Sequence, residues 1–284
     1  MRAAWRPLVV AAACVVAGGW ALTRPGPPPP WPPRPALTAL DIGQGDAILL
    51  RSPDGAAALL DAGPPGAPAP VAGRLRHLGV RRLDALVLTH DSLDHVGGGT
   101  DVLGRLEVGV VLTPPAPRDG WAPPARRVLD AAAAGGVGVR EVAAGDVVRV
   151  GEWRLHVLSP AGPRPAGADP NPYSLVVRAD AADLAALLTA DAESDALATL
   201  PTGTVDVLKV SHHGSEDPGI GPVLARLRPR VAVVSSGEGN AFGHPRAPTL
   251  AALAAAGATT WRTDRAGDVT VTSRDGVLAV AGGR

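Results

Sequence analysis

Cysteine is nearly absent from this sequence of 284 residues, since Cys14 is the only one and it lies within an apolar run. A single cysteine can form neither an intrachain disulfide nor a zinc cluster of cysteine ligands. Any metal site in this chain must therefore use histidine, aspartate or glutamate side chains.

An excess of charge is also missing, because 27 basic side chains balance 27 acidic ones. No strong overall field draws the chain to nucleic acid, a membrane surface or an acidic substrate, so a basic patch would have to be local. Lysine occurs only at Lys209, while alanine, glycine, proline and arginine abound. We interpret this as a base-composition bias of the source genome and give it no functional weight.

The composition leaves room for an enzyme of ordinary size. With 46% hydrophobic residues, the chain can form one large α/β domain or two small ones with a well-buried core. No repeat of solenoid period is present.

The first 24 residues indicate a membrane segment. Arg2 and Arg6 precede the uncharged apolar run from Leu8 to Leu22. A full span needs roughly 20 apolar residues, so this shorter run suits a signal peptide, a signal anchor or a short last transmembrane helix; a buried soluble helix is the alternative. The two arginines favour an N-terminus inside and the remainder outside. We therefore expect a membrane anchor at residues 1–24 with the rest of the chain on the extracytoplasmic side, or else a secreted protein.

A proline-rich segment follows, with the sequence RPGPPPPWPPRP from Arg24 to Pro35. So many prolines exclude helix and sheet interiors and predict a stiff, extended spacer, which we place at residues 25–36. Binding to a partner domain with an aromatic groove is the alternative function of this segment. A single globular domain is then expected over residues 37–284.

Short apolar segments separated by turn residues predict a mixed α/β domain. Helices are expected at residues 70–79, 122–135, 222–229 and 249–257, with a short one after Asp191. Strands are expected at residues 36–42, 46–52, 56–63, 83–90, 108–114, 153–160, 174–180, 184–191, 205–215 and 231–237, and near Thr259 and Val269. Residues 83–90 and 205–212 share a buried-strand pattern ending in a hydroxyl residue and a histidine, which favours two similar halves whose strand ends meet at one rim.

The strongest chemical signal is the run from His90 to His95, His-Asp-Ser-Leu-Asp-His, at the end of an apolar strand. A strand end and a tight loop can aim His90, Asp94 and His95 into one cavity, and imidazole and carboxylate ligands suit zinc or manganese. Gly97, Gly98 and Gly99 follow, where the backbone must turn closely without side chains.

This run resembles the HxHxDH signature of the metallo-β-lactamase superfamily, with Ser92 in place of the second histidine. Together with further segments in the same order, it resembles the soluble domain of the ComEC family of DNA-uptake proteins over about residues 38–275. Those segments are residues 41–47, 60–63, 171–174, 189–193, 208–215 and 240–245. The resemblance implies an αββα four-layer sandwich with its site along one edge of two packed sheets, and it makes the apolar segment the family's last membrane helix.

Carried over position by position, the resemblance implies a metal held by Asp94, His95, Asp191 and one histidine of the pair His212 and His213. We favour His213 as the ligand and His212 as a substrate or proton-transfer residue. Asp191 would bridge toward a second metal beside His90. That second position is poor because Ser92 is a weak ligand and no histidine matches between His95 and Asp191, where His156 lies inside a strand-like segment. We therefore expect one firmly bound zinc or manganese ion rather than two.

Several residues are expected around these ligands. His244, between Gly243 and Pro245, can approach the leaving group or phosphate of a substrate, although a solvated loop histidine is the alternative. Gln44, Asp46 and Asp61 are expected to orient loops and ligands by hydrogen bonds, with turn and cap residues as the alternative. The resemblance adds three residues to this supporting or substrate-contacting group: Ser92, Asn171 and Asn240.

A metal of this kind activates water near neutral pH and polarises a phosphoryl or carbonyl oxygen, which predicts hydrolysis. We expect attack on a phosphodiester, with Asp94 orienting the nucleophile and His212 or His244 assisting the leaving oxygen. The resemblance implies a nuclease that acts on DNA, single-stranded and handled during uptake and transformation, with DNA-channel components as partners.

Two other functions stay open. A secreted or anchored metallo-hydrolase of phosphate or choline esters, lactones or β-lactams would use the same fold and metal. A non-catalytic DNA-binding or channel-gating module is motivated by Ser92 and by the missing histidine.

Overall fold

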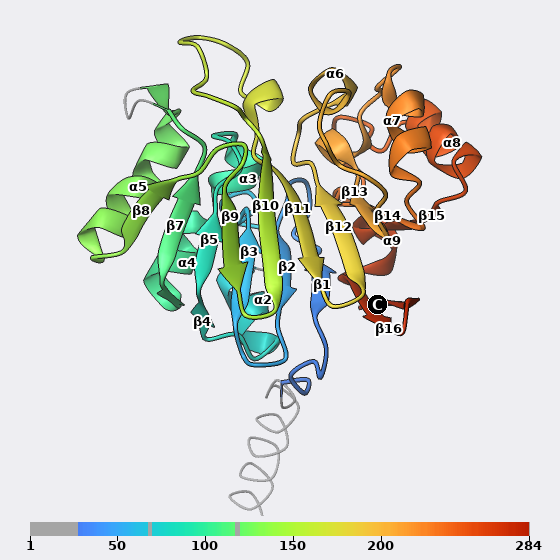
Figure 1. Ribbon diagram of the computed structural model, residues 1–284. Helices are drawn as coiled ribbons and strands as arrows, with labels where there is room; N and C mark the ends of the chain where they lie inside the picture. Colours follow the sequence, from blue (N-terminus) through green and yellow to red (C-terminus); the bar gives the residue numbers. More distant parts are fainter. Residues whose placement is uncertain (1–27, 68–69, 117–119, 284) are drawn as a thin grey trace, which may run out of the picture.

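The computed structural model describes residues 28–67, 70–116 and 120–283, and two β-sheets pack face to face at its centre (Figure 1). The expected membrane segment at residues 1–24 lies outside the described residues. Within the described ranges, no helix is long and apolar enough to cross a membrane.

The first sheet has eight strands, in the order β17-β16-β1-β2-β3-β5-β7-β8. It combines an antiparallel part, from β17 to β3, with a parallel part, from β3 to β8. Its strands are β1 Ala36–Ala39, β2 Ile48–Arg51, β3 Ala57–Leu60, β5 Ala85–Val87, β7 Val110–Thr113, β8 Gly138–Glu141, β16 Val269–Arg274 and β17 Val277–Gly282. A short parallel pair, β4 Arg82–Leu83 with β6 Glu107–Val108, lies apart from it.

The second sheet has seven strands, in the order β15-β14-β13-β12-β11-β10-β9. Strands β9 to β12 form an antiparallel meander, and β12 to β15 are parallel. The strands are β9 Val147–Val150, β10 Trp153–Ser159, β11 Val176–Ala181, β12 Leu184–Leu188, β13 Val207–Lys209, β14 Val231–Val234 and β15 Thr259–Arg262.

Helices cover the outer faces of both sheets. The first sheet carries α2 Val71–His77, α3 Leu93–Val96, α4 Gly99–Arg105 and α5 Pro123–Ala134. The second half of the chain supplies α6 Ser194–Leu197, α7 Ile220–Leu227, α8 Ala247–Ala255 and α9 Thr263–Ala266, together with the 3-10 turns η2 Asn171–Tyr173 and η3 Ser211–Gly214. The result is the expected four-layer αββα arrangement.

Three apolar cores hold these layers together. The central core lies between the sheets, and β10 shows its origin, because Trp153, Leu155 and Val157 alternate into it along the strand. Two outer cores lie between each sheet and its helices. Strands β13 and β14 are buried at every position, as parallel strands are when both faces are covered. Each fully buried leucine or valine contributes about 1.5–3 kcal/mol.

The apolar patterns predicted most of these elements, and several edges differ. Strands β8, β9 and β17 are absent from the expectations; β8 is exposed at all four positions and β17 is buried at none, so neither gives a core-facing signal. At the other end, β1 begins at Ala36, the last residue assigned to the linker. Trp31 in the linker packs on the domain, since its indole N–H donates to the Ser52 carbonyl at 2.7 Å. The C-terminal end of the proline-rich segment is therefore part of the domain surface rather than a free spacer.

The two similar strands, β5 and β13, lie in different sheets and end at the same edge of the sandwich, where α3 and α6 lie at the top of Figure 1. Loops after these strands carry His90 to His95 on one side and Ser211 to Gly214 on the other. The fold thus brings the expected site residues from both halves to one rim.

Candidate metal centre

Close backbone contacts build the loop that carries Asp94 and His95. The Ala62 N–H donates to the His95 carbonyl at 2.7 Å, and the Asp46 N–H donates to the Asp94 carbonyl at 3.2 Å. A Cβ atom on Gly45 would lie 2.1 Å from the Asp94 carbonyl oxygen, and one on Gly98 would lie 2.2 Å from that of Ala62. The glycines are therefore required because no side chain fits between these loops.

His95 is fully buried between two carboxylates. Its Nδ1 lies 2.7 Å from Asp61 Oδ2, and its Nε2 lies 3.1 Å from Asp191 Oδ1. Asp61 is itself held by the Thr89 N–H and hydroxyl, which donate to its two oxygens at 2.8 and 2.7 Å. Asp61 thus fixes the ring so that Nε2 faces Asp191, the arrangement typical of a metal-ligating histidine.

His213 is oriented in the same way from the other half of the molecule. Its Nδ1–H donates to the Ser235 carbonyl at 3.0 Å. Its Nε2 lies 3.3 Å from Asp94 Oδ2 and 3.6 Å from Asp191 Oδ1. The pairing leaves Nε2 directed at the two carboxylates, where it can lose its proton to bind a metal ion.

The tautomer of His90 follows from its neighbour. The Thr89 hydroxyl gives its one proton to Asp61, so it must accept from His90 Nδ1, 3.0 Å away. His90 Nε2 is then unprotonated, and it lies 3.8 Å from Asp191 Oδ2. Three buried imidazoles therefore direct their Nε2 atoms toward one carboxylate.

These inward-facing atoms have no hydrogen-bond partner. The unpartnered buried atoms include Nε2 of His90, His95 and His213, together with Asp191 Oδ1. Buried polar atoms are rarely left unpaired, and acceptors that converge on one point suit a cation. The residues present therefore fit a divalent metal ion.

Asp46 and Asp94 differ in how they face this point. Asp46, His95, Asp191 and His213 each offer a ligand atom, and these atoms all lie within 4.8 Å of one another. However, Asp46 approaches the Nδ1 side of the rings, at 3.9 Å from His95 and 3.4 Å from His213. Asp94 lies on the Nε2 side, so the geometry favours Asp94 as the ligand and Asp46 as a support behind the histidines.

Lys209 holds Asp46 from behind, a role that the sequence analysis missed. Its ammonium forms an ion pair with Asp46 Oδ2 and donates to the Ala190 carbonyl at 3.0 Å, directly before Asp191. Lys209 and Asp46 are each only 1% exposed. The sequence analysis gave this single lysine no functional weight, whereas its contacts place it directly behind the histidine cluster. A lysine retained where 26 of the 27 basic residues are arginine was the signal that could have found it.

The His212 and His213 pair occupies strained backbone, with φ values of 45° and 54°. Consecutive left-handed residues other than glycine are costly and cluster at functional sites. This backbone buries His213 among the carboxylates and leaves His212 half-buried at the rim. His212 Nδ1 lies 2.9 Å from Glu193 Oε1, and its ring lies 5.7 Å from that of His244.

The charges shift several pKa values. Burial lowers the pKa of His213, but the carboxylates of Asp191 and Asp46 outweigh it and raise the pKa to about 9. Burial also lowers the pKa of His95, but the carboxylates of Asp191 and Asp61 outweigh it and raise this pKa well above its usual value. For Asp191, burial raises the pKa, but His95 and His213 outweigh it and lower this pKa well below its usual value. Burial and the neighbouring His95 lower the pKa of His90 to about 3.

The two rim histidines shift in opposite directions. The hydrogen bond to Glu193 raises the pKa of His212. Burial and the nearby His212 lower the pKa of His244. Groups whose pKa values are separated in this way are suited to opposite roles in proton transfer.

Of the other residues expected at the site, some contact its loops and others do not. The Gln44 side-chain oxygen accepts from the Gly237 N–H at 3.2 Å, and Asn240 ties its own loop to the His244 backbone at 2.6 and 3.0 Å. Ser92 precedes α3 and makes no side-chain cap. Asn171 lies in η2, where its N–H donates to Asp169, so the described contacts do not join it to the histidine cluster.

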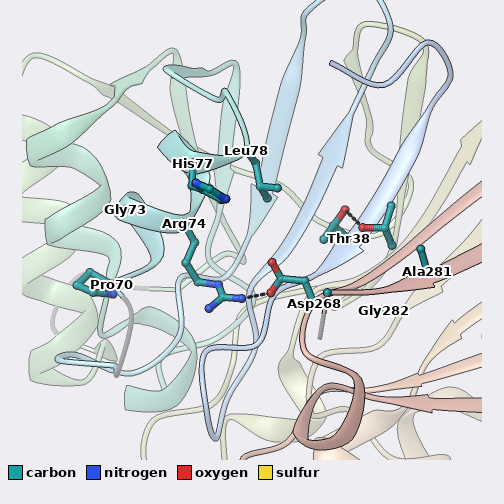
Figure 2. A pocket seen from close by; sticks show the side chains of 11 residues that line it. Thr38, Pro70, Gly73, Arg74, His77, Leu78, Asp268, Ala281 and Gly282 are labelled. Carbon is teal, nitrogen blue, oxygen red and sulfur yellow. Dashed lines mark hydrogen bonds and ion pairs between the residues drawn. The ribbon is translucent and has the colours of Figure 1, made fainter. Parts of the chain in front are cut away.

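A groove leads away from the site. It encloses about 830 Å³ and is lined in part by Gln44, Leu93, Asp94, Asn240 and Phe242. Arg74 lines this groove and also a separate pocket of about 550 Å³, which Figure 2 shows beside Thr38 and Asp268.

Comparison with known proteins identifies the relatives of this fold and site. Residues 40–238 match the family model described as the metallo-beta-lactamase superfamily. The chain is 31% identical over 255 residues to ComE operon protein 3 of Bacillus subtilis, which covers 81% of this chain and 32% of that protein. It is 30% identical over 241 residues to competence protein ComA of Neisseria gonorrhoeae, which covers 82% of this chain and 31% of that protein. The chain thus spans about a third of the length of these curated relatives.

Solved structures agree on the architecture. The metallo-beta-lactamase fold protein YhfI from Bacillus subtilis has a TM-score of 0.57 at 10% identity and covers 87% of this chain and 100% of that one. CmlA, a diiron beta-hydroxylase from Streptomyces venezuelae, has a TM-score of 0.55 at 16% identity and covers 86% of this chain and 55% of that one. At such identities, the likeness shows the fold alone.

Proposed function

Because this chain belongs to the metallo-beta-lactamase superfamily, we propose that it is a metal-dependent phosphodiesterase that cleaves single-stranded DNA during uptake. The observation that carries the hydrolytic part is the convergence of unpartnered Nε2 atoms of His90, His95 and His213 on Asp191. The DNA substrate is supported by the similarity to ComE operon protein 3 and to competence protein ComA, of each of which the chain matches about a third.

In this proposal, Asp94, His95, Asp191 and His213 would hold one zinc or manganese ion, which when bound would supply Lewis acidity and activate water. Asp61 and Ser235 fix the histidine rings, so that little reorganisation is needed when substrate binds. Asp94, at the mouth of the groove, orients the attacking water.

His212 is placed to pass a proton to the leaving oxygen. Glu193 fixes its Nδ1, and the ring is half-buried beside Asp191, at 3.8 Å. His244 stands against it and contacts the other side of the leaving group. We assign the proton transfer to His212 and substrate positioning to His244.

We also propose that the domain works on the extracytoplasmic side of a membrane, with DNA-channel components as neighbours. The support is the pair Arg2 and Arg6 before an uncharged apolar run. Such a location suits an enzyme that degrades a strand arriving from outside.

The test is metal content together with cleavage of a labelled single-stranded oligonucleotide by the chain and its variants. His95→Ala and Asp191→Ala should each lose the metal and reduce cleavage by more than about 100-fold, since even residues behind metal ligands contribute 10–100-fold. His156→Ala is the matched control, because His156 lies on β10 and pairs with Asp180 rather than with the site.

Each other outcome identifies a different function. Unchanged cleavage in both variants would contradict the mechanism. Bound metal with hydrolysis of small esters alone would support the metallo-hydrolase alternative. Neither metal nor cleavage would support a DNA-binding or gating module.

A further inference from the structure

The only phenylalanine of the chain is exposed beside the metal centre. Phe242 is 58% exposed and lines the same groove as Asp94, and Leu93, 48% exposed, lines it too. Among the described residues, five large apolar side chains are exposed, and two of them lie here. An exposed aromatic at the mouth of a site points to a ligand with a flat apolar face.

Hydrogen bonds and close packing hold the loop around Phe242. The Asn240 amide donates to the carbonyls of Gly237 and His244, and its oxygen accepts from the His244 N–H. Gly237 packs so tightly that a Cβ there would lie 2.7 Å from the Gln44 nitrogen. The ring is thus displayed on a loop that needs little ordering when a ligand binds, which favours affinity.

A row of rings joins Phe242 to the metal centre. The ring centroids of Phe242 and His244 lie 5.8 Å apart, those of His244 and His212 5.7 Å, and those of His212 and His213 6.1 Å. A flat group on Phe242 would therefore lie a few ring spacings from the ligands. Because Phe242 also lines the same groove as Asp94, a nucleotide bound in this groove can place its base on Phe242 and its phosphate toward the metal centre.

The charges in the groove favour a base over a phosphate. Its lining includes the carboxylates of Asp41, Asp94 and Glu238. The one cation in the lining, Arg74, is turned to Asp268, with which it forms an ion pair (Figure 2). This lining therefore offers no unpaired basic side chain to a phosphate, whereas an uncharged base needs none.

We propose that Phe242, together with Leu93, stacks an unpaired base of the nucleotide adjacent to the cleaved phosphodiester. This inference rests on the proposed function and deepens it, because a base held in a duplex cannot lie on the ring. Stacking on an aromatic side chain changes affinity by about 5- to 150-fold per base. The groove therefore selects single strands and tolerates any base.

The experiment is a double-mutant cycle between the ring and the base. The metal-loaded full chain and its variant Phe242→Ala bind a fluorescent single-stranded oligonucleotide whose backbone linkages resist hydrolysis, and anisotropy gives Kd. Matched strands carry one abasic residue at successive positions. Phe242→Trp tests whether another flat ring restores binding, and Val277→Ala, which replaces a 67% exposed residue of β17, is the control.

Phe242→Ala should weaken binding of the normal strand by about 5- to 150-fold, and by less than about 2-fold when the abasic residue occupies one particular position. Phe242→Trp should bind like the wild type. An equal loss on normal and abasic strands, or a loss below about 3-fold, would overturn the inference.

Cleavage measured in parallel with metal separates this inference from the proposed function. If the strand is cut but Phe242 and the base show no coupling in the double-mutant cycle, the base site is refuted and the nuclease proposal stands. If the strand is bound with that coupling but is never cut, the nuclease proposal is refuted and the base site stands. If the strand is neither bound nor cut, both proposals are refuted.

Discussion

Replacing Lys209 by methionine should destabilise the domain strongly while keeping the length of the side chain. Lys209 on β13 and Asp46 before β2 are both almost fully buried, and they join the two sheets behind the metal centre. Methionine would leave the Asp46 carboxylate buried without its cation. Breaking a buried ion pair in this way costs about 3–5 kcal/mol, which lowers Tm on the order of 10 °C in a domain of this size.

Two neighbours move the expected value within that range. His213 Nδ1 lies 3.4 Å from Asp46 Oδ1 and can take up part of the charge, which favours the lower end. The Ala190 carbonyl loses the Lys209 donor and keeps the His212 N–H at 3.0 Å, so it adds little. We therefore expect a loss of about 3 kcal/mol.

Guanidinium unfolding in EDTA measures this loss without a contribution from bound metal. The double variant Asp46→Asn with Lys209→Met should be more stable than Lys209→Met alone by at least about 1 kcal/mol, because no buried charge remains. A loss below about 1 kcal/mol, or a double variant no more stable than the single one, would refute the reasoning.

Three further predictions concern the same region. Gly45→Ala should destabilise the domain by about 2 kcal/mol more than Gly55→Ala, because both have positive φ but only the Gly45 Cβ meets the Asp94 carbonyl; equal melting curves would contradict this. Metal binding at pH 7 should release protons, since the pKa of His213 is about 9 in the metal-free protein; titration calorimetry in buffers of different ionisation enthalpy measures this, and equal heats would contradict it. Because that pKa is raised from 6.5, the stability that His213 contributes is complete below pH 6.5 and is lost as pH rises through 9. Arg164→Met should cost about 3 kcal/mol in unfolding experiments, because it leaves the buried Asp91 without its bidentate partner; adding Asp91→Asn should restore part of the loss.

The sequence predicted the parts of the site that are local or that end apolar strands. Residues 90–95 place three side chains of the site within six positions, and the matching strand ends at residues 90 and 212 lie at one rim as expected. The choice of His213 over His212 agrees with the burial of His213 and the position of its Nε2, which strand similarity alone did not indicate.

The remaining features depend on packing between distant segments. Nothing near Asp46 in the sequence indicates that its partner is Lys209, because the two lie on different sheets. Glu193 contacts His212 only because η3 and the start of α6 meet at the rim. Phe242 and Leu93 carry no pattern of their own, and their exposure follows from the groove between the two halves.

The expectation of one ion depends on how the two sides of the Asp191 carboxylate differ. On the Oδ1 side, Nε2 of His95 and Nε2 of His213 lie 3.1 and 3.6 Å away, and Asp94 faces the same His213 nitrogen at 3.3 Å. On the Oδ2 side, Nε2 of His90 and Nε2 of His212 each lie 3.8 Å away, and His212 is half-buried at the rim, where Glu193 holds its other ring nitrogen. The Oδ1 side is thus the more closely drawn together and the more fully buried, which favours one ion there. Metal content per chain tests this expectation, because two bound ions would place the second beside His90 and His212.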